Sequence, residues 1–164
     1  MRFSPLVLML GLAASTVAVS VHSQRPDDQI APKSAELLKQ GEAALAAGNF
    51  IAADDALETA LAVDPRNRAA FVAMARVAIK QKLFGQAIRL TNRAIALEPN
   101  DRDAIAVQGE AMVELGAVAR AKVNLAKLQK LCASGCPQVA TLSAAIARGP
   151  ALAAAKPPAT KKVN

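Results

Sequence analysis

The sequence repeats itself at an interval of 34 residues through its middle part. Residues 68–101 align with residues 34–67 at this interval and, more loosely, with residues 102–135. A fixed period of this length is typical of stacked helical hairpins, because a single hairpin cannot bury its apolar face alone. The repeat therefore predicts an all-α fold, an α-solenoid built from three helix–turn–helix units.

Gly, Asn and Pro residues predict where these helices begin and end. We expect the two helices of each unit to be separated by a turn, at Gly48-Asn49, at Lys82-Leu83 and at Gly116. The pairs Asp64-Pro65 and Glu98-Pro99 should end the first two units, and Ser34, Asn67 and Asp101 should cap the first helices. The helices predicted in this way span residues 34–47, 50–63, 68–81, 84–97 and 102–131, the last being broken at Gly116.

Small residues recur at matching positions of the repeat, at one position on the first helices and at two on the second. They are Gly41, Ala75 and Gly109 on the first helices, Ala53, Ala87 and Ala121 on the second, and Ala60 and Ala94 further along, where the third unit has Leu128. A small side chain is needed where two antiparallel helices approach each other closely. We therefore expect these residues to lie in the seams between helices.

This pattern resembles the tetratricopeptide repeat family, in its exported bacterial form, over about residues 34–131. The resemblance rests on the small residues, on Phe50 and Phe84 at the start of the second helices, and on the prolines that end the units. The first helix of a repeat in this family often carries Trp and Tyr, whereas this chain has Phe71 and small residues in their place. The resemblance implies a right-handed superhelix with a concave groove lined by the first helix of each unit.

The two ends of the chain differ from the repeats. Residues 1–23 resemble a secretory signal, because Arg2 precedes an uncharged apolar stretch that leads to small residues, with cleavage expected after Ser23. An uncleaved membrane anchor is the alternative. Residues 24–33 are a polar linker, residues 137–148 are an expected capping helix that completes a domain of residues 34–148, and residues 149–164 are an expected disordered basic tail. The expected location is the periplasm or the exterior of the cell.

Cys132 and Cys136 are the only cysteines of the chain. In an exported protein the default for such a pair is a disulfide, here across the turn into the capping helix. The alternative is a copper or thiol-redox carrier, since the Cys-x3-Cys-Pro spacing resembles that of copper-delivery proteins and thiolates bind Cu(I). Those proteins also use a distant histidine, whereas the only histidine here is His22, within the signal.

The net charge of +7 raises the question of a nucleic-acid partner. Acidic residues are mixed with basic ones through the repeats, and part of the excess comes from Lys156, Lys161 and Lys162. The chain also has no Trp or Tyr to stack on bases. We therefore expect no nucleic-acid partner, and contact with a membrane only through an uncleaved signal.

Catalysis is not expected either. Beyond Ser23 the chain contains no His, which removes His-dependent triads and the usual zinc ligand sets. Asp54 and Asp55 are adjacent on a helix and therefore diverge around its axis. The sequence predicts no catalytic residue, no metal site and no cofactor.

The remaining candidate site is the groove that the resemblance implies. In this register its lining is Leu38, Glu42, Leu45, Val72, Arg76, Ile79, Ala106, Glu110 and Val113. The charged row Glu42, Arg76 and Glu110 either meets a partner segment or is satisfied between neighbouring units. The groove lacks the basic and Asn residues with which some family members hold the carboxyl terminus of chaperones. The prediction is a non-catalytic adaptor that binds a protein or peptide segment; the copper or thiol-redox carrier is the alternative.

Overall fold

The computed structural model describes residues 29–132 and 135–150. The predicted signal and most of the predicted tail lie outside these residues. The described part contains seven helices and no strand, which confirms the all-α prediction. They are α1 (Pro32–Ala46), α2 (Phe50–Val63), α3 (Arg68–Lys80), α4 (Phe84–Leu97), α5 (Arg102–Glu114), α6 (Val118–Leu131) and α7 (Pro137–Arg148).

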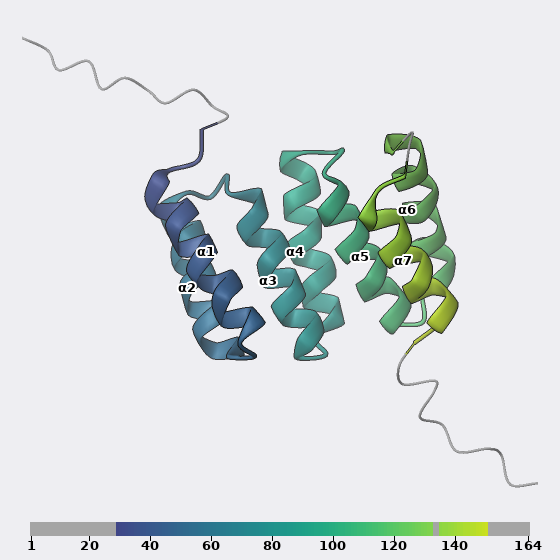
Figure 1. The fold of residues 1–164 in the computed structure, drawn as a ribbon, viewed down its shortest axis with the longest axis horizontal. Helices are drawn as coiled ribbons and strands as arrows, with labels where there is room; N and C mark the ends of the chain where they lie inside the picture. The colour runs from purple at the N-terminus through teal and green to yellow at the C-terminus, as the bar shows by residue number, and fades with distance from the viewer. Residues whose placement is uncertain (1–28, 133–134, 151–164) are drawn as a thin grey trace, which may run out of the picture.

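The helices pack as three hairpins in chain order, α1–α2, α3–α4 and α5–α6, followed by α7. They form a row with α1 and α2 at one end and α6 and α7 at the other (Figure 1). Successive first helices contact one another, α1 with α3, α3 with α5 and α5 with α7, more extensively than α2 contacts α4 or α4 contacts α6. The row therefore curves with α1, α3, α5 and α7 on its inner face and with α2, α4 and α6 on its outer face.

The turns within the hairpins lie where the sequence predicts them. Gly48 and Gly116 have φ values of 76° and 78°, in the left-handed region that glycine adopts without strain. Lys82 takes this role in the second hairpin, with φ 63°. The Asn49 side chain then caps α2 by accepting a hydrogen bond from the Ala52 amide at 3.2 Å.

Ser34 is a correction to the predicted helix start. Helix α1 begins at Pro32, two residues before the predicted start, so Ser34 lies inside the helix and the linker is correspondingly shorter. The Ser34 hydroxyl is buried, donates to the Ala60 carbonyl at 2.7 Å and accepts from Asn67 Nδ2 at 2.8 Å. One unit later, Arg68 Nε donates to Asp101 Oδ2 at 2.8 Å. In each of the first two units, the first residue of the repeat therefore forms a hydrogen bond with the last residue of the same repeat.

The recurring small residues lie in the seams, as predicted. Ala53, Ala75, Ala87 and Ala121 are inaccessible to solvent. At Gly41, an added Cβ would lie 2.5 Å from Leu57 Cγ and 3.3 Å from the Ala53 carbonyl oxygen, so α1 and α2 are too close there for any side chain. The small residues are therefore what allows each pair of helices to nest.

The capping helix closes the apolar end of the row. Leu142 of α7 is fully buried in the third core cluster together with Ile105, Val113 and Leu128. It packs onto Gly109 of α5, where an added Cβ would lie 2.6 Å from both Leu142 δ carbons. Among the residues described, no helix has the length and apolar character needed to cross a bilayer.

Asp64 ties the start of α1 to the end of the first unit, and this contact predicts a pH dependence. Its carboxylate accepts from the Ala31 amide at 2.9 Å and from the Arg66 amide at 3.0 Å. The Ala31 hydrogen bond, followed by the contacts with Arg66, outweighs burial and lowers the pKa of Asp64 below its ordinary value. Because the folded-state pKa is depressed, this stabilisation is present above about pH 4 and is lost as the pH falls through the folded-state pKa.

We therefore expect Asp64→Asn to lower the free energy of unfolding at pH 7 by about 1–3 kcal/mol, since the charged hydrogen bonds are lost. Urea unfolding of the wild type and the variant should show this difference shrinking below about pH 4. A difference that stayed constant or widened down to about pH 2 would contradict the assignment.

Candidate functional site

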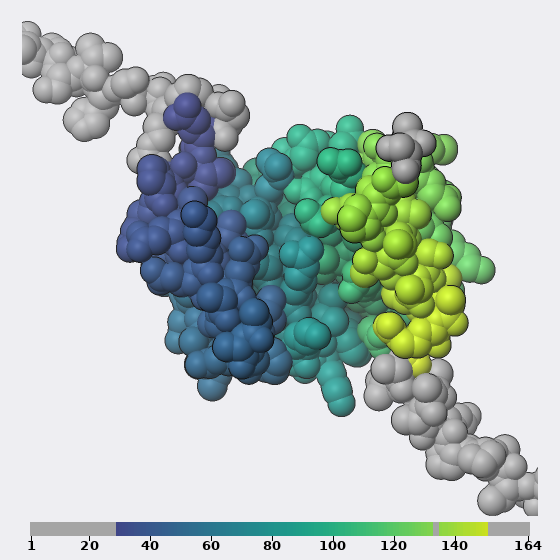
Figure 2. Space-filling view, in the orientation of Figure 1, coloured from purple at the N-terminus to yellow at the C-terminus, as the bar shows by residue number. Residues whose placement is uncertain are grey.

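A pocket of about 210 Å³ lies on the inner face, where α3, α5 and α7 meet. It is lined by Arg76, Asp103, Ala106, Val107, Glu110, Pro137, Gln138 and Thr141. In the space-filling view, the surface of α3 and α5 lies between α1 and α7 (Figure 2). Of the nine predicted groove residues, the structure brings together Arg76, Ala106 and Glu110 at this pocket.

Most of the predicted apolar groove residues belong to the core instead. Val72 and Val113 are 3% and 0% exposed, in the second and third core clusters. Leu38 and Leu45 are half-buried against the first cluster, and Ile79 against the second. Each first helix packs against its own hairpin partner and against neighbouring units, so its aliphatic side chains turn into these seams. The pocket therefore offers a ligand charged and polar side chains together with the apolar surface of Ala106, Val107 and Pro137.

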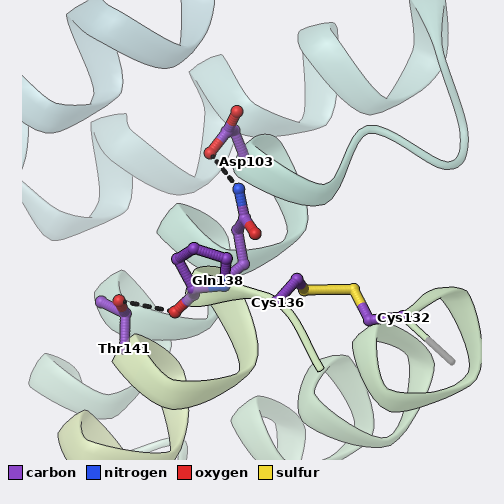
Figure 3. The surroundings of a disulfide bond; sticks show 6 residues. Asp103, Cys132, Cys136, Gln138 and Thr141 are labelled. Atoms are coloured by element: carbon purple, nitrogen blue, oxygen red, sulfur yellow. Dashed lines mark hydrogen bonds between the residues drawn. A yellow bond between two sulfur atoms is a disulfide. The ribbon is translucent and has the colours of Figure 1, made fainter. Parts of the chain in front are cut away.

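The charged row is also arranged differently from the prediction. Arg76 Nη2 donates to Asp103 Oδ1 at 3.4 Å, so the partner of this arginine is on α5, one turn from Ala106. The same oxygen accepts from Gln138 Nε2 of α7 at 3.0 Å (Figure 3). Glu42 is exposed and forms no ion pair among the described residues. A network of Arg76, Asp103 and Gln138 thus joins α3, α5 and α7 across the pocket.

Glu110 is the most perturbed group of the pocket. Desolvation by burial raises the pKa of its carboxyl group, and the positive charges of Arg76, Arg148 and Lys80 offset this only in part. Within the described residues its carboxylate forms no hydrogen bond or ion pair at contact distance. A ligand that donates a hydrogen bond to this carboxylate would therefore be favoured.

Helix α7 supplies a wall of the pocket that sequence reasoning missed. Pro137, Gln138 and Thr141 all lie in its first turn or just after it. Thr141 Oγ1 donates back to the Pro137 carbonyl at 2.9 Å. The signal for this wall was present, because α7 begins about one repeat period after α5 and so continues the register of the first helices. The sequence prediction treated residues 137–148 only as a helix that covers the apolar end of the row, and so it did not include them in the groove.

The predicted disulfide is present and holds this wall. Cys132 ends α6, Cys136 precedes α7, and their Cα atoms are 5.8 Å apart. Figure 3 shows the bond beside Gln138 at the start of α7. In this oxidised form the pair has no thiolate, the ligand on which a copper carrier would depend. Within residues 29–132 and 135–150, no group of three or more His, Cys, Asp or Glu side chains is placed to hold a metal ion.

The described residues thus define a class: an α-solenoid of three helical hairpins with a capping helix and an inner pocket of mixed polarity. Residues 44–109 match the family model of the tetratricopeptide repeat. Residues 44–109 are therefore tetratricopeptide repeat sequence, and the described helices have the fold of tetratricopeptide repeat domains.

Solved structures of similar fold include the TPR2B domain of yeast Sti1 in complex with pHsp70, with a TM-score of 0.65 and 20% identity over 72% of this chain and 98% of that one. The first TPR domain of Spaghetti (RPAP3), bound to the HSP90 peptide SRMEEVD, has a TM-score of 0.63 and 23% identity over 70% and 96%.

An O-GlcNAc transferase from Thermobaculum terrenum also matches, with a TM-score of 0.63 and 24% identity, over 70% of this chain but only 22% of that enzyme. At these identities the likeness shows the fold alone. A comparison with curated protein sequences found no match.

Proposed function

We propose that this protein is a non-catalytic adaptor of the cell envelope that binds a segment of a partner protein on the inner face of its solenoid. The observation that carries the proposal is the pocket between α3, α5 and α7, which combines charged and polar side chains with apolar surface and is built from the second unit, the third unit and the capping helix. The envelope setting is supported by the signal-like residues 1–23. We place the protein in the periplasm or outside the cell on the same ground.

The structural relatives indicate the kind of partner. The domain of RPAP3 is solved with a short HSP90 peptide, and that of Sti1 with pHsp70. A peptide segment is therefore the class of ligand that we propose for this chain as well. Its identity will differ, because the groove lacks the basic and Asn residues that the family uses to hold the carboxyl termini of chaperones.

The pocket residues favour a segment with polar side chains of both kinds. Arg76 is 43% exposed in its side chain and can meet a carboxylate while remaining near Asp103. Glu110 gains from a basic side chain or an amide that donates to it, because its carboxylate is desolvated and none of the described residues donates a hydrogen bond to it. The amide of Gln138 and the hydroxyl of Thr141 provide further polar contacts on α7.

We expect Arg76→Glu to weaken partner binding about tenfold, since it places a negative charge beside the carboxylates of Asp103 and Glu110 and removes the only cation among the described residues that line the pocket. Immobilised protein should recover the partner from envelope extract, and the affinity of the recovered segment can then be measured by calorimetry. Glu110→Gln should weaken binding less and should remove part of the pH dependence of binding above about pH 4, because burial raises the pKa of the Glu110 carboxyl group.

The matched control is Lys82→Glu, which makes the same change of charge at an exposed turn outside the pocket. Its affinity should stay within about twofold of the wild type. Equal loss in Lys82→Glu and Arg76→Glu would show a non-specific charge effect. Unchanged binding in Arg76→Glu would show that the inner pocket is not the site.

A further inference from the structure

The second helices of the three units carry charges of one sign each. Helix α2 has Asp54, Asp55 and Glu58 and no basic residue. The charged residues of α4 and α6 are all basic. They are Arg89, Arg93, Arg120, Lys122, Lys127 and Lys130. The mixture of charges expected from the sequence therefore separates on the outer face, which is acidic at the α2 end and basic from α4 onward. We call the six basic residues the outer basic face.

A polar bridge shows that α4 and α6 adjoin across α5. Gln108 Nε2 donates to Asn92 Oδ1 of α4 at 2.6 Å, and Asn124 Nδ2 of α6 donates to Gln108 Oε1 at 3.0 Å. Residues three or four apart on a helix share one side, so Arg89 lies beside Asn92, and Arg120 and Lys127 lie beside Asn124. These cations therefore lie near the polar bridge that links α4 to α6 through Gln108.

The outer basic face is not neutralised within the described part of the chain. Its residues are exposed except for Lys127, which is half-buried and donates to the Pro99 carbonyl at 2.6 Å. The ion pairs of the described residues involve Lys33, Arg66, Arg68, Arg76 and Arg148, and none of the six. Six uncompensated cations on adjoining helices repel one another and attract an anionic partner.

Apolar side chains at this face indicate the kind of anionic partner. Val123 is 69% exposed next to Lys122, and Leu97 is 45% exposed at the end of α4. Leu97 also borders a hollow of about 240 Å³ lined by Pro65, Phe71, Ala96 and Arg93, which combines an apolar wall with a cation. Basic residues interleaved with apolar ones suit the headgroup region of a bilayer, where the cations meet lipid phosphates.

Nucleic acid is a poorer fit to the same face. Single-strand binding depends on exposed aromatic side chains for base stacking. The described aromatic residues are Phe50, Phe71 and Phe84, and all three are half-buried. We propose that the outer basic face docks this protein on a membrane surface that contains anionic phospholipids.

The docked orientation follows from the charges. An anionic surface repels the acidic residues of α2, so the molecule rests on its α4–α6 end with α2 directed away. The inner pocket is on the opposite side of the helix row, formed by α3, α5 and α7, and remains open to a partner. Membrane docking and partner binding are therefore independent events.

Flotation of the full chain with vesicles tests this proposal. We expect vesicles of phosphatidylcholine with about one third phosphatidylglycerol to bind at least tenfold more protein than phosphatidylcholine alone, with the excess lost at about 0.5 M salt. The double variant Lys122→Glu and Lys130→Glu should lose at least tenfold of this excess. Circular dichroism checks that its helix content is that of the wild type.

The control is Lys39→Glu with Lys82→Glu, which makes the same change in net charge at two exposed lysines outside this face. Binding of this variant to the anionic vesicles should stay within about threefold of the wild type, since its new charges lie away from the docking face and are screened by salt. Equal binding to both kinds of vesicle would overturn the proposal, as would equal losses in the two double variants. Tighter binding to a single-stranded oligonucleotide than to the anionic vesicles would also overturn it.

Discussion

Replacing Leu142 by alanine should lower the free energy of unfolding by about 2–5 kcal/mol, because it removes a large side chain from a fully buried position. Leu142 lies in the third core cluster between α5, α6 and α7, and its δ carbons fill the space that Gly109 leaves open. The remaining contacts of α7 are mostly half-buried, through Val139 and Ile146. Urea unfolding followed by circular dichroism measures the loss.

The matched control is Leu115→Ala, the same change at a leucine that is 54% exposed. It should alter the stability by no more than about 0.5 kcal/mol. Leu142→Ala should also reduce partner binding, because α7 carries Gln138 and Thr141 into the pocket. Similar stabilities for the two variants would mean that α7 does not close the core.

Glycine-to-alanine substitutions should have opposite effects at two helical positions. At Gly41 the new Cβ would meet Leu57 Cγ at 2.5 Å, so we expect a net loss of about 1–3 kcal/mol from overpacking of α1 against α2. At Gly85 the nearest atom is Arg89 Nη1 at 3.9 Å, so alanine should stabilise α4 by about 0.5–1 kcal/mol.

Thermal and urea unfolding of both variants give the comparison directly, since the chemical change is identical. Helix propensity alone would stabilise both proteins, and only close helix packing separates them. A Gly41→Ala variant as stable as Gly85→Ala would contradict the role of the small residues in the seams.

The elements of the fold were predictable because their signals are local. Gly48, Asn49, Gly116 and Asp101 act on the residues next to them, and the helices end where these residues indicate. Ser34 was misinterpreted for the same reason. Its sequence neighbours favour a helix cap, whereas its actual partners, Ala60 and Asn67, are brought to it by the packing of the hairpin.

The site was predicted only in part. The position of a residue in the repeat predicts which side of its helix it lies on, but not how deeply its side chain is buried. Arg76 and Glu110 do reach the pocket, while Val72 and Val113 are taken up by the seams with neighbouring helices. The charge separation on the outer face was also missed. Charges that are mixed along the chain can still separate along one face, because α2, α4 and α6 lie on the same side and each carries charges of one sign.

The central claim is that a partner segment binds on the inner face of the solenoid, between α3, α5 and α7. Methyl NMR during titration with the recovered segment tests it most directly. The methyl signals of Ala106, Val107 and Thr141, which line the pocket, should shift, while those of Ile51, Val63 and Val123 on the outer helices should stay in place. Shifts confined to the outer helices, with the three pocket signals unchanged, would contradict the claim.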